Sequence, residues 1–386
     1  MPAGRKISKN SSANTSEKNT PQKKIRYAVV GLGFISQAAI LPAFAHAKGN
    51  SELVALVSGD DTKLKKLAKK YKVAKTYNYE GYADCLSSGE VDAVYIGLPN
   101  NMHRAYTEGA AQAGVHVLCE KPMAMDEKEC IGMIEVASKN NVKLMIAYRL
   151  HFEKGNLSAA NLIREGKIGE PRYFRSAFSQ QVPAGNIRLD KSLGGGPIYD
   201  LGVYCINAAR YLFRAEPEEV FAFHSSGNDK RFAEVPEMTS VTLRFPEDRL
   251  ASFTCSFGAA DRSTYEVVGT KGVLKMDPAY SMTGEIKGEI IIGEKTRKLT
   301  FPKRDQFGPE LVYFSDCILH NREPEPSGAE GLADVRIINA IFDSATQNKP
   351  VKLQPVDTGK RPTLNQEIQK PPVDEPALIR AAAPSK

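Results

Sequence analysis

Short runs of β-branched and other apolar residues alternate with amphipathic stretches between Ile25 and about Ala147. Brief apolar runs indicate buried strands, whereas apolar positions recurring every three to four residues form one face of a helix. Strands that alternate with helices are typical of βαβ units, whose strands run parallel. The predicted strands are Ile25–Val30, Leu53–Val57, Val91–Ile96, Val115–Cys119 and Lys143–Ala147, and the predicted helices are Thr62–Tyr71, His103–Ala113 and Glu127–Asn140.

The pattern changes after about Tyr148, where two helices precede a series of strands with turns between them. Such a meander favours a largely antiparallel sheet with helices on one face. The predicted elements are helices Asn156–Glu165 and Pro197–Phe213, strands Val220–Ser225, Met238–Phe245, Ala251–Phe257, Thr264–Val268, Val273–Met276 and Glu289–Ile292, and final helices near Pro309–His320 and Ala329–Gln347.

The predicted fold class is α/β with two domains, since 386 residues exceed the roughly 250 to 300 at which single cores stop growing. Residues 25–147 form a Rossmann domain with a doubly wound parallel sheet. Residues 148–354 are predicted to form an α+β domain that carries the substrate site, with a large, mostly antiparallel open sheet. Polar composition predicts a disordered basic arm over residues 1–24 and a disordered tail over residues 355–386.

The formal charge of +7 lies mostly in the N-terminal arm, since residues 1–26 carry seven basic side chains against Glu17. The rest of the chain is nearly neutral, which argues against nucleic acid as a partner. A salt-sensitive gel shift that is lost on deleting residues 1–24 would restore that possibility.

A glycine turn follows the first strand, at Gly31-Leu32-Gly33-Phe34-Ile35. Glycine lets the backbone approach a dinucleotide pyrophosphate and point free amides at it. The third position of the G-x-G-x-x-G pattern is Ser36, which departs from the pattern but is still small. Pro42 predicts a kink or break in the helix that follows.

The end of the second strand carries Ser58 rather than a carboxylate, with Lys63 about one helical turn later. An acidic residue there would bind the ribose diol of NAD and repel a 2′-phosphate. Ser58 and Lys63 therefore favour NADP, with NAD as the alternative. The competing interpretation makes Asp60 or Asp61 a helix N-cap and Lys63 a solvated lysine. Leu98-Pro99-Asn100 follows another strand, where a nicotinamide ribose would pass or a turn would need such residues anyway.

Lys121, Asp200 and Tyr204 form the predicted catalytic group. Lys121 follows a buried strand, and Asp200 and Tyr204 share one face of a helix at i and i+4. A tyrosine ordinarily has a pKa of about 10, and an adjacent ammonium favours its ionised form. The hypothesis makes Tyr204 the general base on a sugar hydroxyl, with Lys121 tuning it and Asp200 fixing a second hydroxyl. Gly194-Gly195-Gly196 before the helix is either a close approach to a ligand or a flexible linker.

The six cysteines form no C-x-x-C pair and the six histidines no ligand spacing, so buried thiols and structural histidines are expected, without a metal. No apolar run is long enough for a membrane span and no signal region precedes the fold, which favours a cytoplasmic protein. Further candidates for the substrate cleft are Arg149, His151, Arg175, Arg188 and Tyr313.

At Gly31-Leu32-Gly33, Glu120-Lys121-Pro122 and Asp200 with Tyr204 the chain resembles the Gfo/Idh/MocA oxidoreductase family over about Ile25 to Leu353. Tyr204, where most members carry histidine, is similar to the glucose-fructose oxidoreductase branch. The resemblance implies a sugar substrate, NADP and a homodimer or homotetramer built through the open sheet. It implies that Lys121, Asp200 and Tyr204 are catalytic, and His103, Glu120 and Arg149 complete the predicted cofactor-contacting set.

The namesake enzyme of that branch is exported and retains its NADP, but the N-terminal arm here carries no export signal. Exchangeable NADP and oxidation of an aldose at C1 to a lactone are therefore expected. The alternatives are reduction of a ketone or dicarbonyl, dehydrogenation of an aromatic diol, and a non-catalytic NADP and sugar sensor.

Overall fold

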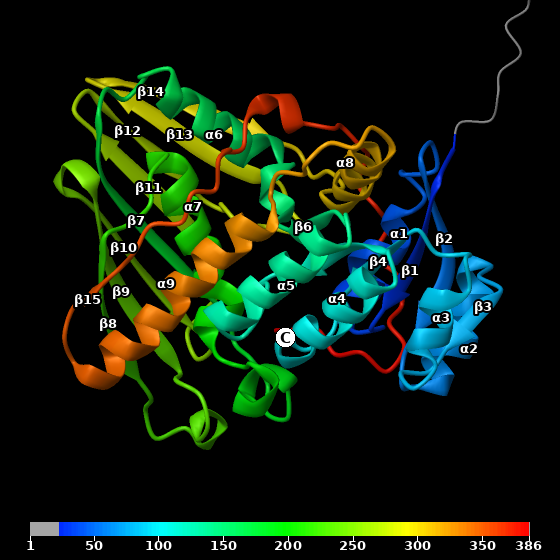
Figure 1. Ribbon diagram of the computed structural model, residues 1–386. Coiled ribbons are helices and arrows are strands. Elements are labelled where there is room, and N and C mark those ends of the chain that lie inside the picture. Colours follow the sequence, from blue (N-terminus) through cyan, green and yellow to red (C-terminus); the bar gives the residue numbers. More distant parts are fainter. Residues whose placement is uncertain (1–22, 386) are drawn as a thin grey trace, which may run out of the picture.

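Two sheets lie side by side in the computed structural model, which describes residues 23–385 (Figure 1). The predicted N-terminal arm therefore lies outside the described residues apart from Lys23 and Lys24. Within the described part of the chain, no helix is long and apolar enough to cross a membrane.

The first sheet has six parallel strands in the order β3-β2-β1-β4-β5-β6; the alternating pattern predicted five of them and missed β3. Strand order reverses between β1 and β4, and ligands bind at the carboxyl ends of strands beside such a switch point. The strands are β1 (Ile25–Val30), β2 (Ser51–Val57), β3 (Lys75–Tyr77), β4 (Ala93–Ile96), β5 (His116–Glu120) and β6 (Leu144–Ala147).

The helices of this part lie on both sides of the sheet and include one that the sequence pattern did not predict, α3. The break expected at Pro42 is present, because a π-helical turn over Ser36–Ile40 gives way there to a short helix, α1 (Leu41–Ala43). The other helices are α2 (Asp61–Tyr71), α3 (Tyr82–Ser87), α4 (His103–Gln112) and α5 (Glu127–Lys139).

The second sheet has nine strands in the order β14-β13-β12-β11-β7-β10-β9-β8-β15. It is antiparallel except between β7 and β10. Its strands are β7 (Pro171–Ser179), β8 (Glu219–Ser225), β9 (Met238–Phe245), β10 (Arg249–Ser256), β11 (Arg262–Gly269), β12 (Gly272–Met276), β13 (Ile286–Ile292), β14 (Lys295–Phe301) and β15 (Val351–Lys352).

Helices cover one face of this second sheet, including α6 (Lys154–Arg164), α7 (Val203–Phe213) and α9 (Gly328–Gln347) (Figure 1). Inward-facing residues such as Phe174 are fully buried against them. Tyr173, Phe223 and Leu250 are among the large apolar side chains left exposed. Assembly of a dimer or tetramer through the open face stays a prediction.

Helix α8 (Phe307–Leu319) joins the two parts, because it packs on the first sheet although it follows the strands of the second. Leu311 and Phe314 share one apolar core with Tyr27 of β1, and the Tyr27 hydroxyl lies 2.8 Å from Ser315 Oγ. The two final helices therefore pack back on the body, as expected.

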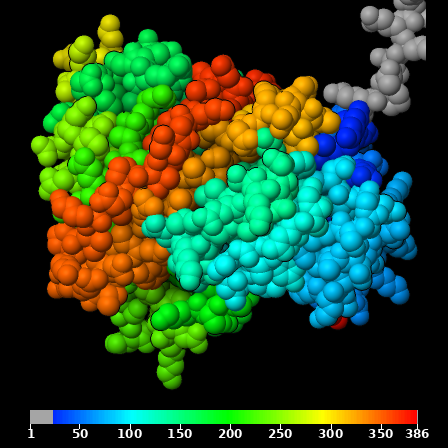
Figure 2. All heavy atoms as spheres, viewed as in Figure 1, coloured from blue at the N-terminus to red at the C-terminus, as the bar shows by residue number. Residues whose placement is uncertain are grey.

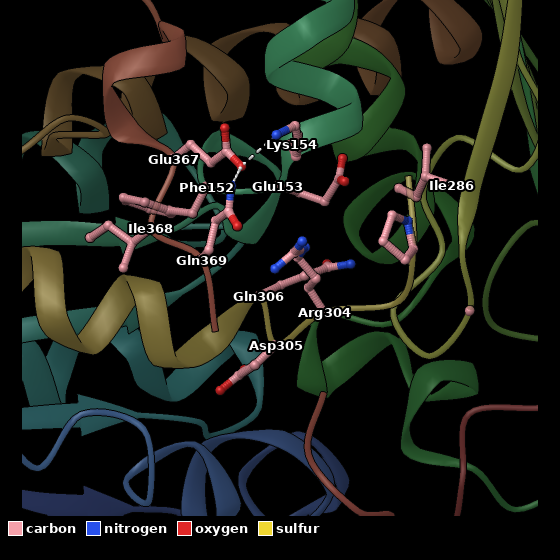
Figure 3. Close-up of a pocket in the computed structure, with 12 residues that line it drawn as sticks. Phe152, Glu153, Lys154, Ile286, Arg304, Asp305, Gln306, Glu367, Ile368 and Gln369 are labelled. Atoms are coloured by element: carbon pink, nitrogen blue, oxygen red, sulfur yellow. Dashed lines mark hydrogen bonds and ion pairs between the residues drawn. The ribbon is translucent and has the colours of Figure 1, made fainter. Parts of the chain in front are cut away.

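The segment after Leu353 differs from the predicted disordered tail, since it contacts the body through Gln366 and Ile379, and Figure 2 shows part of it lying across the surface. Gln366 is buried and its Nε2 donates to the Glu325 carbonyl at 3.1 Å. Glu367 forms an ion pair with Lys154 at 3.1 Å, as the close-up in Figure 3 shows. Polar contacts of single side chains hold this segment, and such contacts leave no periodic signal in a sequence.

Candidate active site

A cleft of about 890 Å³ opens at the carboxyl ends of the parallel strands and reaches across to α7. Among the residues lining it are all the predicted catalytic and cofactor-contacting residues except His103. Segments 31–35, 98–100 and 120–121 come from the first domain, whereas Asp200 and Tyr204 come from the second. The cleft thus brings together the two groups of residues that were predicted from separate parts of the chain.

The glycine turn after β1 has the conformation that a dinucleotide site requires. Gly31 has φ +86°, and a Cβ there would lie 2.5 Å from the Gly97 carbonyl oxygen. A Cβ on Gly33 would meet no atom within 4 Å, so this backbone faces open space in the cleft. Ser36 takes the third position of the pattern by donating its hydroxyl to the Gly31 carbonyl at 2.6 Å. The turn therefore fits a pyrophosphate without a third glycine.

Ser58 and Lys63 line the same cleft at the end of β2, where the adenosine ribose of a dinucleotide would lie. The interpretation of Asp60 as an N-cap holds, since its Oδ1 accepts from the Lys63 amide at 3.1 Å. Lys63 therefore contributes its amide to the cap, and its side chain lines the cleft.

His103 does not line the cleft but lies fully buried behind its wall. Its Nδ1 lies 2.9 Å from the Pro122 carbonyl oxygen and its Nε2 lies 3.0 Å from that of Leu98. Burial lowers the pKa of this imidazole, although the two carbonyl groups oppose the effect. His103 thus joins the loops that carry Leu98 and Lys121, instead of contacting a cofactor.

Lys121 follows β5 and reaches across the cleft to Asp200. Its Nζ donates to the Asp200 carbonyl at 2.9 Å and to the Asp200 carboxylate at 3.2 Å. The same Nζ lies 4.7 Å from the centroid of the Tyr204 ring. Burial lowers the pKa of Lys121, but electrostatic interactions with Tyr204 and Asp200 outweigh burial, so the net shift is upward. The predicted catalytic trio is therefore brought together.

Arg149 is the direct partner of the Tyr204 phenol oxygen. The sequence hypothesis assigned this role to Lys121. The Nε of Arg149 donates to that oxygen at 3.1 Å, and the Arg149 guanidinium carbon lies 4.9 Å from the ring centroid. Arg149 also donates to the Tyr280 carbonyl at 2.7 Å and to Gln306, which fixes the guanidinium. Two cations thus contact the Tyr204 side chain, one at its oxygen and one at its ring.

Asp200 is held between two cations, Lys121 and Arg188, and Arg188 donates to its Oδ2 at 2.6 Å. Burial would raise the pKa of Asp200, but Arg188 and Lys121 lower it well below its ordinary value. The carboxylate is ionised and oriented, with 22% of its side chain exposed to the cleft. Arg188 therefore acts on the site through Asp200.

Glu120 supports the trio from behind. It is buried, accepts from the Tyr95 hydroxyl at 2.6 Å, and accepts weakly from the Lys121 amide at 3.3 Å. Burial raises the pKa of Glu120 despite the nearby charge of Lys121.

The glycine run before α7 is a close packing of backbone rather than a flexible linker. A Cβ on Gly195 would lie 2.5 Å from the Arg188 carbonyl oxygen. Gly194 has φ +80°, and its carbonyl accepts from Asn100 Nδ2 at 2.8 Å. These contacts hold the Arg188 loop beside Asp200 and against the turn at Asn100.

The structure separates the remaining candidates. Arg188 lines the cleft, whereas His151 is buried between Glu325 and Asn207, Arg175 pairs with Glu266, and Tyr313 lies behind Phe152. Sequence analysis missed Tyr280 and Phe178, whose stacked rings lie in the cleft wall with their centroids 5.0 Å apart. No motif marks these two aromatic residues, because the fold alone brings them together. All six cysteines are buried and free, as predicted.

Residues 23–385 contain no group of three His, Cys, Asp or Glu side chains that could hold a metal ion. Three cations of the cleft, Lys121, Arg149 and Arg188, contact Tyr204 or Asp200.

Comparison with known proteins agrees with this geometry. Residues 25–148 match the model of an oxidoreductase family with an NAD-binding Rossmann fold, and residues 156–275 match the Gfo/Idh/MocA C-terminal domain. The chain belongs to the Gfo/Idh/MocA family. It is therefore an NAD(P)-dependent oxidoreductase, as the resemblance implies.

Similar proteins include a D-xylose 1-dehydrogenase [NADP(+)] of Haloarcula marismortui, 32% identical over 87% of this chain and 95% of the relative. The crystal structure of an aldose-aldose oxidoreductase from Caulobacter crescentus, complexed with glycerol, has a TM-score of 0.82 and 37% identity, over 86% of this chain and all of that one. An NADP complex of a 3-ketoreductase from Actinomadura kijaniata has a TM-score of 0.77 and 27% identity, over 83% of this chain and 98% of that one.

Proposed function

We propose that the protein oxidises an aldose at C1 to a lactone, with NADP as the hydride acceptor. The observation that carries the proposal is the position of Tyr204, whose phenol contacts Lys121 and Arg149 in the same cleft as the glycine turn. Oxidation of an alcohol removes a hydroxyl proton and a hydride, so it requires a base beside the nicotinamide site.

Tyr204 takes the proton from the C1 hydroxyl in this mechanism. Lys121 and Arg149 stabilise the phenolate before the transfer, since both lie against its ring or oxygen. As the C–H bond at C1 breaks, its electron pair leaves with the hydrogen and the C1–O bond becomes a carbonyl. The products are the lactone, NADPH and the proton on Tyr204, so atoms and charge balance.

Asp200 positions the sugar in this proposal. Its carboxylate is kept ionised by Arg188 and Lys121, and it accepts a hydrogen bond from a second sugar hydroxyl. Phe178 and Tyr280 provide an apolar wall for the ring of the sugar.

Gly31, Gly33 and the backbone that follows would hold the pyrophosphate, and Ser58 with Lys63 the adenosine ribose. Leu98, Pro99 and Asn100 line the cleft towards Lys121, where the nicotinamide ribose would lie. When bound, the nicotinamide supplies an acceptor for the hydride at C4.

The relatives support an aldose more than a ketone. The xylose dehydrogenase and the aldose-aldose oxidoreductase are 32% and 37% identical to this chain, whereas the 3-ketoreductase is 27% identical. Reduction of a keto sugar is the second candidate, because Tyr204 could return a proton as an acid in the reverse reaction. The arrangement of Lys121, Asp200 and Tyr204 argues against a non-catalytic sensor.

A panel assay tests the proposal. Purified protein with NADP should form NADPH with aldoses, pentoses and hexoses included, and the product should be a lactone by mass spectrometry. The same panel should contain keto sugars and dicarbonyls with NADPH, and aromatic diols with NADP. Highest kcat/KM for a keto sugar would replace the proposal with the second candidate. Two aldoses without added NADP form the control for retained cofactor, and no turnover is expected there.

Replacing Ser58 by aspartate should shift the cofactor preference. The new carboxylate would accept from the ribose diol of NAD and repel a 2′-phosphate, so the kcat/KM ratio of NADP to NAD should fall by about tenfold or more. Ser58→Ala is the matched control, since it removes the hydroxyl without adding charge. An unchanged ratio in Ser58→Asp would place the adenosine ribose elsewhere.

A further inference from the structure

The segment Ile379–Ser385 is hydrogen-bonded to the helical turn that follows the glycine turn. The Ile379 amide donates to Gln37 Oε1 at 2.8 Å, and Gln37 Nε2 donates back to the Ile379 carbonyl at 2.9 Å. Gln37 is 1% exposed and also donates to the Leu32 carbonyl at 2.9 Å. Two hydrogen bonds to a fixed, buried amide therefore anchor this segment beside the predicted pyrophosphate site.

Beyond this anchor, residues 380–385 line the same cleft as Gly33, Ser58 and Lys63. They form a wall over the nucleotide end of the cleft that the parallel sheet does not supply. The Asn186 side chain contacts the Ala383 carbonyl at 3.4 Å, on the opposite side of the cleft. The segment thus runs from the Rossmann domain towards the loop that carries Arg188.

Arg380 brings a positive charge to the end of β2. Its guanidinium lies 3.5 Å from the carboxylate of Asp60, the residue that caps α2. Asp60 lies two residues beyond Ser58, and its negative charge would repel a 2′-phosphate bound near Ser58. Arg380 neutralises this acid and adds a second cation to Lys63 on the cleft wall. The C-terminal segment therefore adds one positive charge to this part of the cleft.

We propose that the segment Ile379–Ser385 forms part of the nucleotide site and that Arg380 makes this site prefer NADP over NAD. The inference rests on the proposed use of NADP but not on the identity of the sugar. Its physical basis is a charge supplied from the far end of the chain, about 320 residues from the acid that it offsets.

Binding of NADP and NAD to the full chain, measured by calorimetry without sugar, tests this assignment. Arg380→Ala should raise the Kd of NADP about tenfold, the size expected for losing a charged hydrogen-bond partner, while the Kd of NAD stays unchanged or falls. Arg380→Lys should retain most of the NADP affinity. Lys349→Ala, an exposed lysine beyond α9, is the matched control and should alter neither Kd.

A second variant, deletion of residues 380–386, keeps the Ile379 anchor and removes the wall. Its release rates for NADPH and NADH in stopped-flow displacement should both rise because the wall is gone, and the rate for NADPH should rise more because the Arg380 charge is also lost. Equal changes for both nucleotides, or none, in folded variants would overturn the proposal. If the parent protein prefers NADP but Arg380→Ala does not alter that preference, only this inference fails. If no aldose reacts while the Kd ratios change as expected, only the proposed reaction fails.

Discussion

Replacing Tyr204 by phenylalanine is expected to lower kcat for aldose oxidation by about 10²- to 10⁴-fold, the range that one general base contributes. The substitution removes the oxygen that Arg149 contacts at 3.1 Å but keeps the ring that packs beside Phe178. The Kd of NADP should stay within about twofold, because the ring still fills its place in the cleft wall.

Tyr211→Phe is the matched control on the same helix. Its hydroxyl donates to Asn156 in the core at 3.1 Å, away from the cleft, so its loss should lower thermal stability slightly and leave kcat unchanged. Steady-state kinetics of both variants with calorimetric NADP binding separate the two roles. Near-parental kcat in Tyr204→Phe would remove Tyr204 as the base.

Replacing Lys121 by methionine should lower kcat by about 10³-fold and raise the KM for the sugar, because Lys121 contacts both Tyr204 and Asp200. Without the ammonium, the phenolate loses one of its two cationic neighbours and Asp200 keeps only Arg188. Lys349→Met serves as the control for replacing an exposed lysine. A variant that keeps the parental kcat and KM would show that Arg149 alone is enough to support Tyr204 and Arg188 alone is enough to orient Asp200.

The pH profile of the same variant gives an independent readout. The folded-state pKa of Asp200 is lowered and that of Lys121 is raised. Their pairing therefore stabilises the fold fully between about pH 4 and pH 10, and is lost as the pH falls through the lowered value or rises through the raised one. In Lys121→Met the pKa of Asp200 should rise, so the acid limb of kcat/KM should move to higher pH. An acid limb that does not move would show that Lys121 does not affect the pKa of Asp200.

Hydrophobic patterning was sufficient for five of the six strands of the parallel sheet, because these strands are largely buried and read as apolar runs. It failed for β7, although this strand lies in the middle of the second sheet. β7 reads Pro171-Arg172-Tyr173-Phe174-Arg175-Ser176, in which the polar Arg172 and Ser176 share a face with the buried Phe174 and Tyr173 lies on the exposed face, so the alternation is lost. The short strands β3, β14 and β15 were missed as well, since few of their residues are buried.

Motifs predicted most of the site for a related reason. Each motif depends on local geometry: the glycine turn, the lysine after β5, and the pair Asp200 and Tyr204. The strand order, with one switch point, brings the glycine turn and Lys121 to the same edge of the sheet, and the cleft joins them to Asp200 and Tyr204. The contact of Arg149 with Tyr204 was not predicted, because it joins residues 55 positions apart and leaves no local pattern. Arg188 lies beside Asp200 as its second cation because Gly195 packs against the backbone of the loop that carries Arg188.

By itself the sequence determined the α/β fold with its parallel and antiparallel sheets and the glycine turn, and it selected Lys121, Asp200 and Tyr204 as the proposed catalytic residues, because these inferences depend on periodicity and short-range stereochemistry. Only the tertiary structure decided which cations touch Tyr204 and Asp200, that His103 lies behind the cleft, and that residues 379–385 line it. Those arrangements depend on contacts between segments far apart in the chain, made by single polar side chains. No local pattern records such contacts, so they appear only when the chain is folded.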